Sequence, residues 1–323
     1  RALKSFEPIH FFGANRLSHP VNTLINNIAD KKLWLIGHDM LGYFDFNDST
    51  VHRFAGNLPQ EIPFKNDLDK YYPSFKAHLI PDFPIHLRYE AALLHHKELW
   101  IATSGGLLHF IPKSRAFKLY RYNPSTGYHD LDSLYSITLS PSQDELLLNS
   151  AGGMLSFNLR KLSYTRFPND RLSKEITAFT IHKNMIFYAS GSSIYSCTPQ
   201  GLNIRKVEGI PNRGLLRWIE GGSGDDFIIS SDQWMMICRF DRSKRDATVW
   251  KVIPAPMTPS SIRRVVRGAS GGWWISGRQG LLRIDKKGIL HKTQTHLLSH
   301  EVEEDCWGLV EEPSGKLWVS TAS

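Results

Sequence analysis

Short apolar runs, separated by turn residues, recur along the whole chain. Each copy is a run of leucine, β-branched and aromatic residues, a turn of Gly, Ser, Asn or Asp, and a second apolar run, which is the pattern of a β-hairpin. The anchors in the middle of the first runs are Trp34, Trp100, Leu147, Phe187, Ile228, Trp274 and Trp318. The spacings between them are 66, 47, 40, 41, 46 and 44 residues. A period in the forties, made of short strands, is typical of propeller blades.

A complete repeat contains four apolar runs. One run precedes the anchor hairpin, two form the hairpin, and a fourth follows most hairpins. No stretch keeps apolar residues at helical spacing over three turns, which argues against a helical array. The pattern therefore predicts an all-β fold, a seven-bladed β-propeller, as a single domain over residues 1–323.

The two ends of the chain predict how the ring closes. The last copy stops after its second strand, and residues 8–13 form a spare apolar strand. We expect this N-terminal strand to pair with the C-terminal hairpin, because an open ring would expose strand edges. One strand would still be missing, so we interpret the chain as a fragment of a longer protein.

The long first spacing contains an insertion within residues 56–89 that is rich in Pro and aromatic residues. Two interpretations stay open. The insertion is either a loop packed on the rim, as repeat insertions commonly are, or a binding or docking loop.

Composition supports a folded core, with 41% hydrophobic residues. No apolar run approaches the roughly 18 residues of a membrane span, so we expect no membrane segment. Cys197 and Cys238 occupy equivalent places in adjacent repeats, too far apart for the roughly 5.5–6 Å Cα separation of a disulfide. We therefore expect these residues and Cys306 to be small buried hydrophobes.

Positive charge is concentrated in residues 201–292, which hold 17 Lys and Arg against 8 Asp and Glu. The chain as a whole has a net charge of +8, so the rest is nearly neutral. No recognition helix or aromatic platform accompanies this charge, and we expect no nucleic-acid binding. A solvated rim, an anionic glycan and the acidic surface of a partner protein remain as interpretations.

Residues 305–321 resemble the two-component regulator propeller repeat. The pattern of that family is a strand, an acidic residue, a turn ending in Gly, and then Leu-Trp-Ile/Val-Gly/Ser-Thr. Residues 41–47 and 280–285 resemble its second half, with Gly, Leu, an aromatic or aliphatic residue and Asp. The resemblance covers nearly the whole chain, although the copies at Phe187 and Ile228 lack the Trp and the Gly-Leu pair.

Such repeats resemble the periplasmic half of Bacteroidetes hybrid two-component sensors, in which propellers precede a β-sandwich, a membrane helix and a histidine kinase. Those sensors usually respond to oligosaccharides and switch on glycan-degradation genes. The resemblance therefore implies a periplasmic sensor propeller that contributes to oligosaccharide sensing and signal transduction, without a cofactor. Further domains of the same chain are the implied partners, and a homodimer stays open.

We expect a ligand at the loops between the second and third strands, which emerge around the axis on one face. The chemically rich loops contain His38, Asp39, Asp232, Gln233, Trp234, Arg278 and Gln279. Polar groups around an aromatic on a concave face are typical of a sugar site. The basic excess favours an acidic or sulfated oligosaccharide, with Arg278 on the anionic group and Trp234 as a stacking surface.

No nucleophile–base pair or metal cluster is visible at motif level, so we expect no catalytic residue and no metal. The glycines of 103–106 and 150–153 belong to hairpin turns, because no helix follows them. Two other classes stay open. One is a non-catalytic protein-binding or dimerisation propeller. The other is a propeller lyase or hydrolase, which needs convergent carboxylates, His or a metal near the axis.

Overall fold

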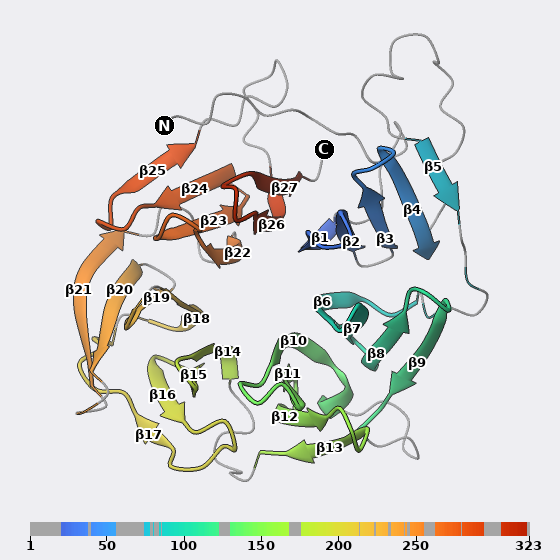
Figure 1. The fold of residues 1–323 in the computed structure, drawn as a ribbon. Helices are drawn as coiled ribbons and strands as arrows, with labels where there is room; N and C mark the ends of the chain where they lie inside the picture. Colours follow the sequence, from blue (N-terminus) through green and yellow to red (C-terminus); the bar gives the residue numbers. More distant parts are fainter. Residues whose placement is uncertain are drawn as a thin grey trace.

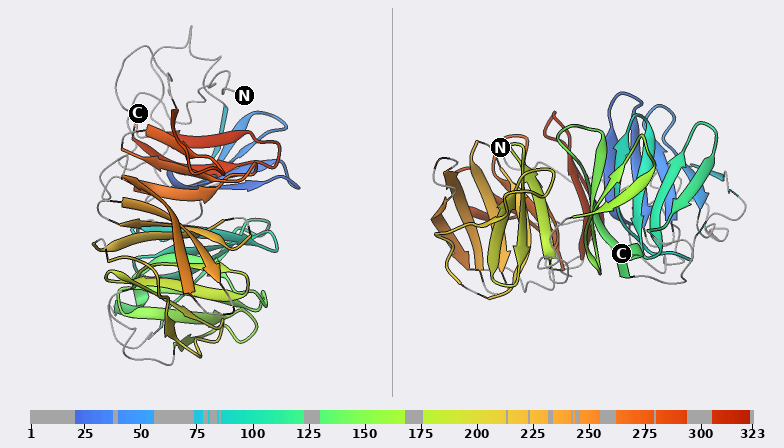
Figure 2. Two further views of the ribbon diagram at one scale, coloured as in Figure 1. Left: turned by 90° about the vertical axis from the view of Figure 1, so that its left-hand side faces the viewer. Right: turned by 90° about the horizontal axis from the view of Figure 1, so that it is seen from below.

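The strands of each repeat follow one another in chain order within one antiparallel sheet, as tandem hairpins require. The computed structural model describes residues 21–37, 40–55, 74–77, 80, 84, 86–122, 130–167, 176–212, 214–222, 224–231, 234–241, 243, 246–254, 262–278, 280–293 and 305–321. Six sheets of four or five strands are arranged as blades around an axis, and a two-stranded sheet lies between the sixth and the first (Figure 1). Seen edge-on, the ring is flattened (Figure 2).

The blades are numbered in chain order, and the first strand of each is the innermost (Figure 1). Blade 1 contains β1 (Val21–Asn27), β2 (Lys32–Gly37), β3 (Met40–Asp45), β4 (Thr50–Ala55) and β5 (Ser74–Ala77). Blade 2 contains β6 (Tyr89–His95), β7 (Glu98–Thr103), β8 (Gly106–Ile111) and β9 (Ala116–Tyr120). Blade 3 contains β10 (Leu134–Leu139), β11 (Glu145–Ser150), β12 (Gly153–Asn158) and β13 (Ser163–Arg166), after a short 3-10 turn, η1 (Asp130–Asp132).

The second half of the ring repeats this plan. Blade 4 contains β14 (Ile176–His182), β15 (Met185–Ser190), β16 (Ser193–Cys197) and β17 (Arg205–Lys206). Blade 5 contains β18 (Leu216–Gly221), β19 (Asp226–Ser231), β20 (Trp234–Asp241) and β21 (Asp246–Pro254). Blade 6 contains β22 (Ile262–Arg267), β23 (Trp273–Gly277), β24 (Gly280–Ile284) and β25 (Leu290–Thr293), and the hairpin consists of β26 (Cys306–Glu311) and β27 (Leu317–Thr321).

The anchors lie at one position of the second strand in every sheet. Trp100 pairs with Leu93 on the innermost strand, and Ile228 pairs in the same way with Glu220. Trp34, Trp100 and Trp274 are at most 4% exposed and pack in the core, whereas Trp318 is only partly buried. The register predicted for the two poor copies, at Phe187 and Ile228, is confirmed by the same pairing.

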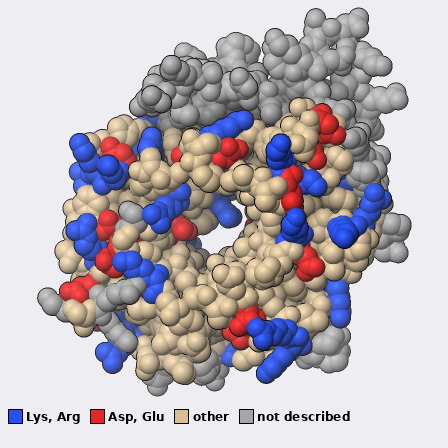
Figure 3. All heavy atoms as spheres, viewed as in Figure 1, with Lys and Arg blue, Asp and Glu red and all other residues tan. Residues whose placement is uncertain are grey.

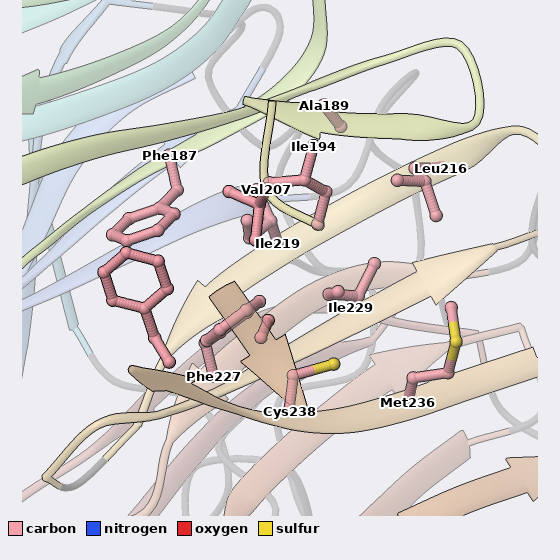
Figure 4. Close-up of a cluster of buried hydrophobic side chains, with 12 residues drawn as sticks. Phe187, Ala189, Ile194, Val207, Leu216, Ile219, Phe227, Ile229, Met236 and Cys238 are labelled. Atoms are coloured by element: carbon pink, nitrogen blue, oxygen red, sulfur yellow. The ribbon is translucent and has the colours of Figure 1, made fainter. Parts of the chain in front are cut away.

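The core lies between blades, because each sheet buries its faces against its neighbours. Figure 4 shows one such layer, in which Phe187 and Ile194 of blade 4 meet Ile219, Phe227 and Ile229 of blade 5. Cys197, Cys238 and Cys306 are all buried and free, so the prediction of small buried hydrophobes is confirmed. The pKa of the Cys197 and Cys238 thiols is raised to about 12 by burial.

The glycines of 103–106 and 150–153 form the β7–β8 and β11–β12 turns, as predicted. Gly106 has a φ of 131°, a conformation that L side chains rarely adopt. A Cβ there would also collide with the carbonyl oxygen of Tyr120 on the next strand. The turn therefore needs glycine for backbone reasons.

The prediction of seven four-stranded blades is wrong. The described residues form six complete blades and the β26–β27 hairpin, because no third strand pairs with β27 in the described ranges. The predicted closure by residues 8–13 lies outside the described residues. The sequence insertion adds β5, which pairs in parallel with β4 at the outer edge of blade 1, and the rest of the insertion is almost entirely outside the described residues.

The hairpin nevertheless bridges blades 6 and 1. The Ser276 hydroxyl of blade 6 donates to the carbonyl oxygen of Trp307 on β26, at 3.0 Å. Ser320 on β27, at the equivalent position, donates to the carbonyl oxygen of Val21 on β1, at 2.5 Å. These bonds place the last and first described strands side by side, as Figure 1 also shows. Within the described ranges, no helix has the length and apolar character that a membrane span requires.

Candidate functional site

One face of the ring carries both the turns between second and third strands and the starts of the innermost strands. Val21 at the start of β1 pairs with Gly37 at the end of β2, and Ile262 pairs with Gly277 in the same way. We call this the mouth face. Figure 3 shows that a channel opens through the centre of the ring, with Lys and Arg atoms at its margin. The described parts of the predicted loops therefore lie on one face of the ring.

Every innermost strand has a register irregularity one residue after it begins. Such bulges redirect a side chain and are common beside functional sites. The residues at this position are Asn22, Glu90, Tyr135, Thr177, Arg217, Arg263 and Trp307, which we call the mouth ring. Seven residues of six types thus occupy equivalent backbone positions at the mouth-face ends of the innermost strands.

The mouth ring is richest in charge and aromatic surface around blade 6. The Arg263 guanidinium lies 3.7 Å from the Trp307 ring centroid. It also forms an ion pair with Asp305, at 3.1 Å between Nη2 and Oδ2. Arg217 and Tyr135 are exposed, and Tyr135 retains 47% of its accessible surface. Cationic and aromatic groups at the mouth suit an anionic ligand with a ring to stack.

The predicted site residues are only partly described. His38, Asp39, Asp232, Gln233 and Gln279 lie outside the described residues, so their placement stays a prediction.

Trp234 begins β20 and is partly buried, and its backbone N–H donates to the Ser231 hydroxyl at 3.1 Å. Arg278 is exposed in the β23–β24 turn of the neighbouring blade. The register places both on the mouth face, as predicted.

Glu220 and Arg264 are charged groups of the channel wall that sequence analysis missed. They lie on β18 and β22, the innermost strands of blades 5 and 6 (Figure 1). Burial raises the pKa of the Glu220 carboxyl to about 7, against the opposing effect of the Arg264 charge. Burial also lowers the pKa of the Arg264 guanidinium, and here Glu220 opposes the change. Both retain some accessible surface, which is consistent with a place beside the channel.

An alignment of the repeats could have identified the charged and aromatic residues of the innermost strands. Aligning the innermost strands on the anchors brings Arg217, Arg263 and Trp307 into one column, and Glu220 and Arg264 into columns that are otherwise uncharged. Attention to the loops alone could not find them, because these side chains project from strands.

Asp45, Asp48 and His52 in the β3–β4 turn have ligand atoms within 4.8 Å of one another. The carboxylates serve the turn itself, since Asp45 accepts from the Asn47 backbone N–H and Asp48 from that of Thr50. Blade 6 repeats the Asp–His pair as Asp285 and His291, at 3.1 Å. Turn formation therefore accounts for the positions of the two carboxylates.

Residues 268–272 match the pattern Gly-x-Ser-x-Gly, which the sequence prediction overlooked. In α/β-hydrolases this pattern places a nucleophilic Ser between a strand and a helix. Here it forms the β22–β23 hairpin turn, with a bond from the Gly268 N–H to the Gly272 carbonyl oxygen. The Ser270 hydroxyl accepts from Arg283 at 2.6 Å, and the turn lacks the architecture of a nucleophile elbow.

A second hollow, of about 470 Å³, lies between the outer strands of blades 2 and 3. Tyr120, Tyr122 and Tyr164 line it together with Arg121. The Tyr164 hydroxyl donates to the Tyr120 carbonyl oxygen at 2.9 Å, and burial raises the pKa of that hydroxyl. These tyrosines hold the two blades together at the rim, away from the channel.

Known proteins share this fold at low sequence identity. No family model matches the chain, and no curated protein matches it. Solved structures do match, among them two from one organism. One is the extracellular domain of the putative hybrid two component system BT4673 from B. thetaiotaomicron, with a TM-score of 0.66 and 13% identity over 98% of this chain. The other is that of BT3049 from the same organism, with a TM-score of 0.60 and 14% identity over 94% of this chain.

The shared fold is a β-propeller. The chain spans 39% of the length of each of these two structures, and at this identity the likeness shows the fold alone. The repeats resembled sensors of this kind, and the two solved neighbours are extracellular domains of proteins described as putative hybrid two component systems. Neither match tests the predicted ligand residues.

Proposed function

We propose that this propeller is an extracytoplasmic sensor module of a hybrid two-component regulator, on the periplasmic side of the inner membrane. Its role is recognition rather than catalysis, and it passes ligand binding to further domains of the same protein. Support comes from the repeat pattern and from the extracellular sensor domains that share the fold. A histidine kinase in the parent protein is part of this proposal.

The ligand that the mouth face suits best is an acidic or sulfated oligosaccharide. The observation that carries this proposal is the group of three arginines on that face, Arg217, Arg263 and Arg278, all from blades 5 and 6. Guanidinium groups bind carboxylate and sulfate oxygens through paired hydrogen bonds. Trp307 and Trp234 offer ring surface beside these charges, and sugar rings stack on such surfaces.

Titration calorimetry with sulfated and unsulfated forms of one oligosaccharide, at low and high salt, tests the proposal. We expect the sulfated form to bind more tightly and to weaken as salt rises, because exposed charges are screened over about 8–10 Å. Arg278→Gln should weaken binding of the sulfated form. Lys286→Gln is the matched control, since it removes one exposed positive charge from the same blade at the β24–β25 turn, on the opposite face.

Three outcomes would contradict this proposal. An equal loss of affinity in Arg278→Gln and Lys286→Gln would show that the ligand is only attracted at long range by the positive charge of residues 201–292. Absence of binding to every glycan, together with self-association through blades 5 and 6, would favour the alternative of a protein-binding or dimerisation propeller. Turnover of a glycan would favour the lyase or hydrolase alternative.

A further inference from the structure

The channel wall contains two charges where the repeat elsewhere has none. Glu220 occupies the innermost-strand position opposite the anchor, where the other six sheets have Ile25, Leu93, Thr138, Thr180, Val266 and Val310. Arg264 occupies the position two residues earlier, where the others have Thr23, Ala91, Ser136, Ala178, Trp218 and Gly308. Both exceptions fall on adjacent blades.

Arg264 differs from Arg263, its neighbour in sequence. Arg263 forms an ion pair with Asp305 and stacks on Trp307. Arg264 has only the longer-range attraction of Glu220, and no hydrogen bond or close ion pair engages its guanidinium in the described part of the chain. The guanidinium is only partly buried, so its donors remain available to a group that enters from solvent.

The direction of β22 fixes where such a group must come from. The strand begins on the mouth face, passes the mouth ring at Arg263 and continues inward through Arg264 and Val265. A ligand at the mouth reaches Arg264 only with a part that projects along the channel. The end of an oligosaccharide can do so, whereas a residue in mid-chain would have to thread the ring.

We propose that Arg264 forms an oxyanion subsite within the channel, which takes a singly charged carboxylate or sulfate ester at the terminal sugar of the ligand. This inference rests on the proposed function, because it specifies which part of an acidic oligosaccharide is read. Glu220 lines the same channel and balances the charge of Arg264, so a group with one negative charge fits better than one with two. The Glu220 carboxyl also offers oxygens to the hydroxyl groups of that sugar.

The test uses three disaccharides that differ only at the terminal sugar, which is a uronate, a sulfate ester or neutral. Arg264→Gln should weaken binding of the charged disaccharides by about tenfold or more, as expected for the loss of charge-assisted hydrogen bonds. Binding of the neutral disaccharide should not change. Arg267→Gln, which removes an exposed charge from the other end of β22, is the matched control and should have little effect.

A double variant, Glu220→Gln with Arg264→Gln, removes both buried charges and guards against a folding defect of the single variant. It should fold and show the same loss of selectivity for the charged terminus. Preference for the uronate over the sulfate ester, or the reverse, identifies the group that the subsite takes.

The failures of the two proposals can be told apart. Acidic disaccharides could bind the Arg264→Gln variant as tightly as wild type but bind the Arg278→Gln variant weakly. The mouth face would then bind the ligand, and the proposal of a subsite within the channel would be wrong. If an internal acidic sugar binds as well as a terminal one, the proposal that a chain end is read is wrong. If no acidic glycan binds, both proposals are overturned.

Discussion

Blade 2 and the β26–β27 hairpin carry the same strand pattern but bury it to different extents. In β7, five of the six residues are buried and Trp100 is 4% exposed. In β27, every residue is only partly buried, including Trp318. Trp100 stacks on His109 of β8 at 3.9 Å between ring centroids and packs against Phe157 of blade 3 at 5.6 Å.

Trp318 has a more polar surrounding. Its indole N–H donates to Glu312 at 2.7 Å, and the Lys316 ammonium lies 4.1 Å from its ring. One aromatic contact, with Phe46 of blade 1 at 5.1 Å, ties it to the neighbouring sheet. The difference teaches that the Leu-Trp pattern specifies a strand, whereas its burial depends on the third and fourth strands of the sheet and on the next blade.

The largest effect should come from removing the two anchors. Trp100→Ala should lower the free energy of unfolding by about 3–5 kcal/mol, because it leaves a cavity between blades. Trp318→Ala should cost roughly 1–2 kcal/mol, since less apolar surface is lost. Urea denaturation followed by circular dichroism measures both. Equal costs would show that the hairpin is as well covered as a complete blade.

The second prediction concerns the residue on the innermost strand that pairs with the anchor. Blade 2 has Leu93 there and the hairpin has Val310, but blade 5 has Glu220. Its folded-state pKa of about 7 lies above the ordinary value of 4.5, so the native state binds the extra proton. Stability from this group is therefore present at low pH and is lost as pH rises from about 4.5 to about 7.

Glu220→Gln should accordingly be more stable than wild type at pH 8, by on the order of 1–3 kcal/mol, and similar to it at pH 5. Thermal and urea unfolding of both proteins across this range measures the difference. A difference that does not depend on pH would show that Glu220 does not titrate in this window.

The third prediction compares the two junctions of the β26–β27 hairpin, one with blade 6 and one with blade 1. Ser276→Ala removes the bond from blade 6 to the hairpin, and Ser320→Ala removes the bond from the hairpin to blade 1. The second change should cost more, roughly 1–2 kcal/mol, because Ser320 also accepts the Gly308 backbone N–H at 2.7 Å. Ser314→Ala, at an exposed turn of the same hairpin, is the control.

The smallest effect should come from an exposed ion pair between complete blades. Lys97 Nζ lies 3.0 Å from Asp30 Oδ1, with the Lys97 side chain 75% exposed. Lys97→Ala should change stability by less than about 1 kcal/mol, and salt should reduce that change further. A larger cost would mean that charge pairs, and not buried strands, hold blades 1 and 2 together.

Sequence periodicity predicted the strands and their order, because hairpin patterns are local and recur. It also placed Phe187 and Ile228 correctly, although these copies lack the Trp. It overestimated the number of complete blades, since a repeat that begins in sequence need not supply four strands. Pairing between distant segments depends on tertiary structure, which a local pattern does not encode.

The candidate site was harder to predict than the fold. Of the predicted site residues, the structure describes Trp234 and Arg278, and both are on one face. Arg217, Arg263 and Trp307 were missed because a bulge, which is a feature of strand pairing, sets them at one equivalent position of the innermost strands. The charges of Glu220 and Arg264 look ordinary in the sequence, and their unusual character comes only from burial.

The recurring bulge also has a consequence for how such a protein changes over generations. The mouth ring contains an amide, a carboxylate, a phenol, a hydroxyl, two guanidinium groups and an indole at one backbone position. The pairing of the sheet therefore imposes little restriction on the side chain there. Selection can alter the mouth one residue at a time without altering the strand pairing, so new specificities are within reach of single substitutions.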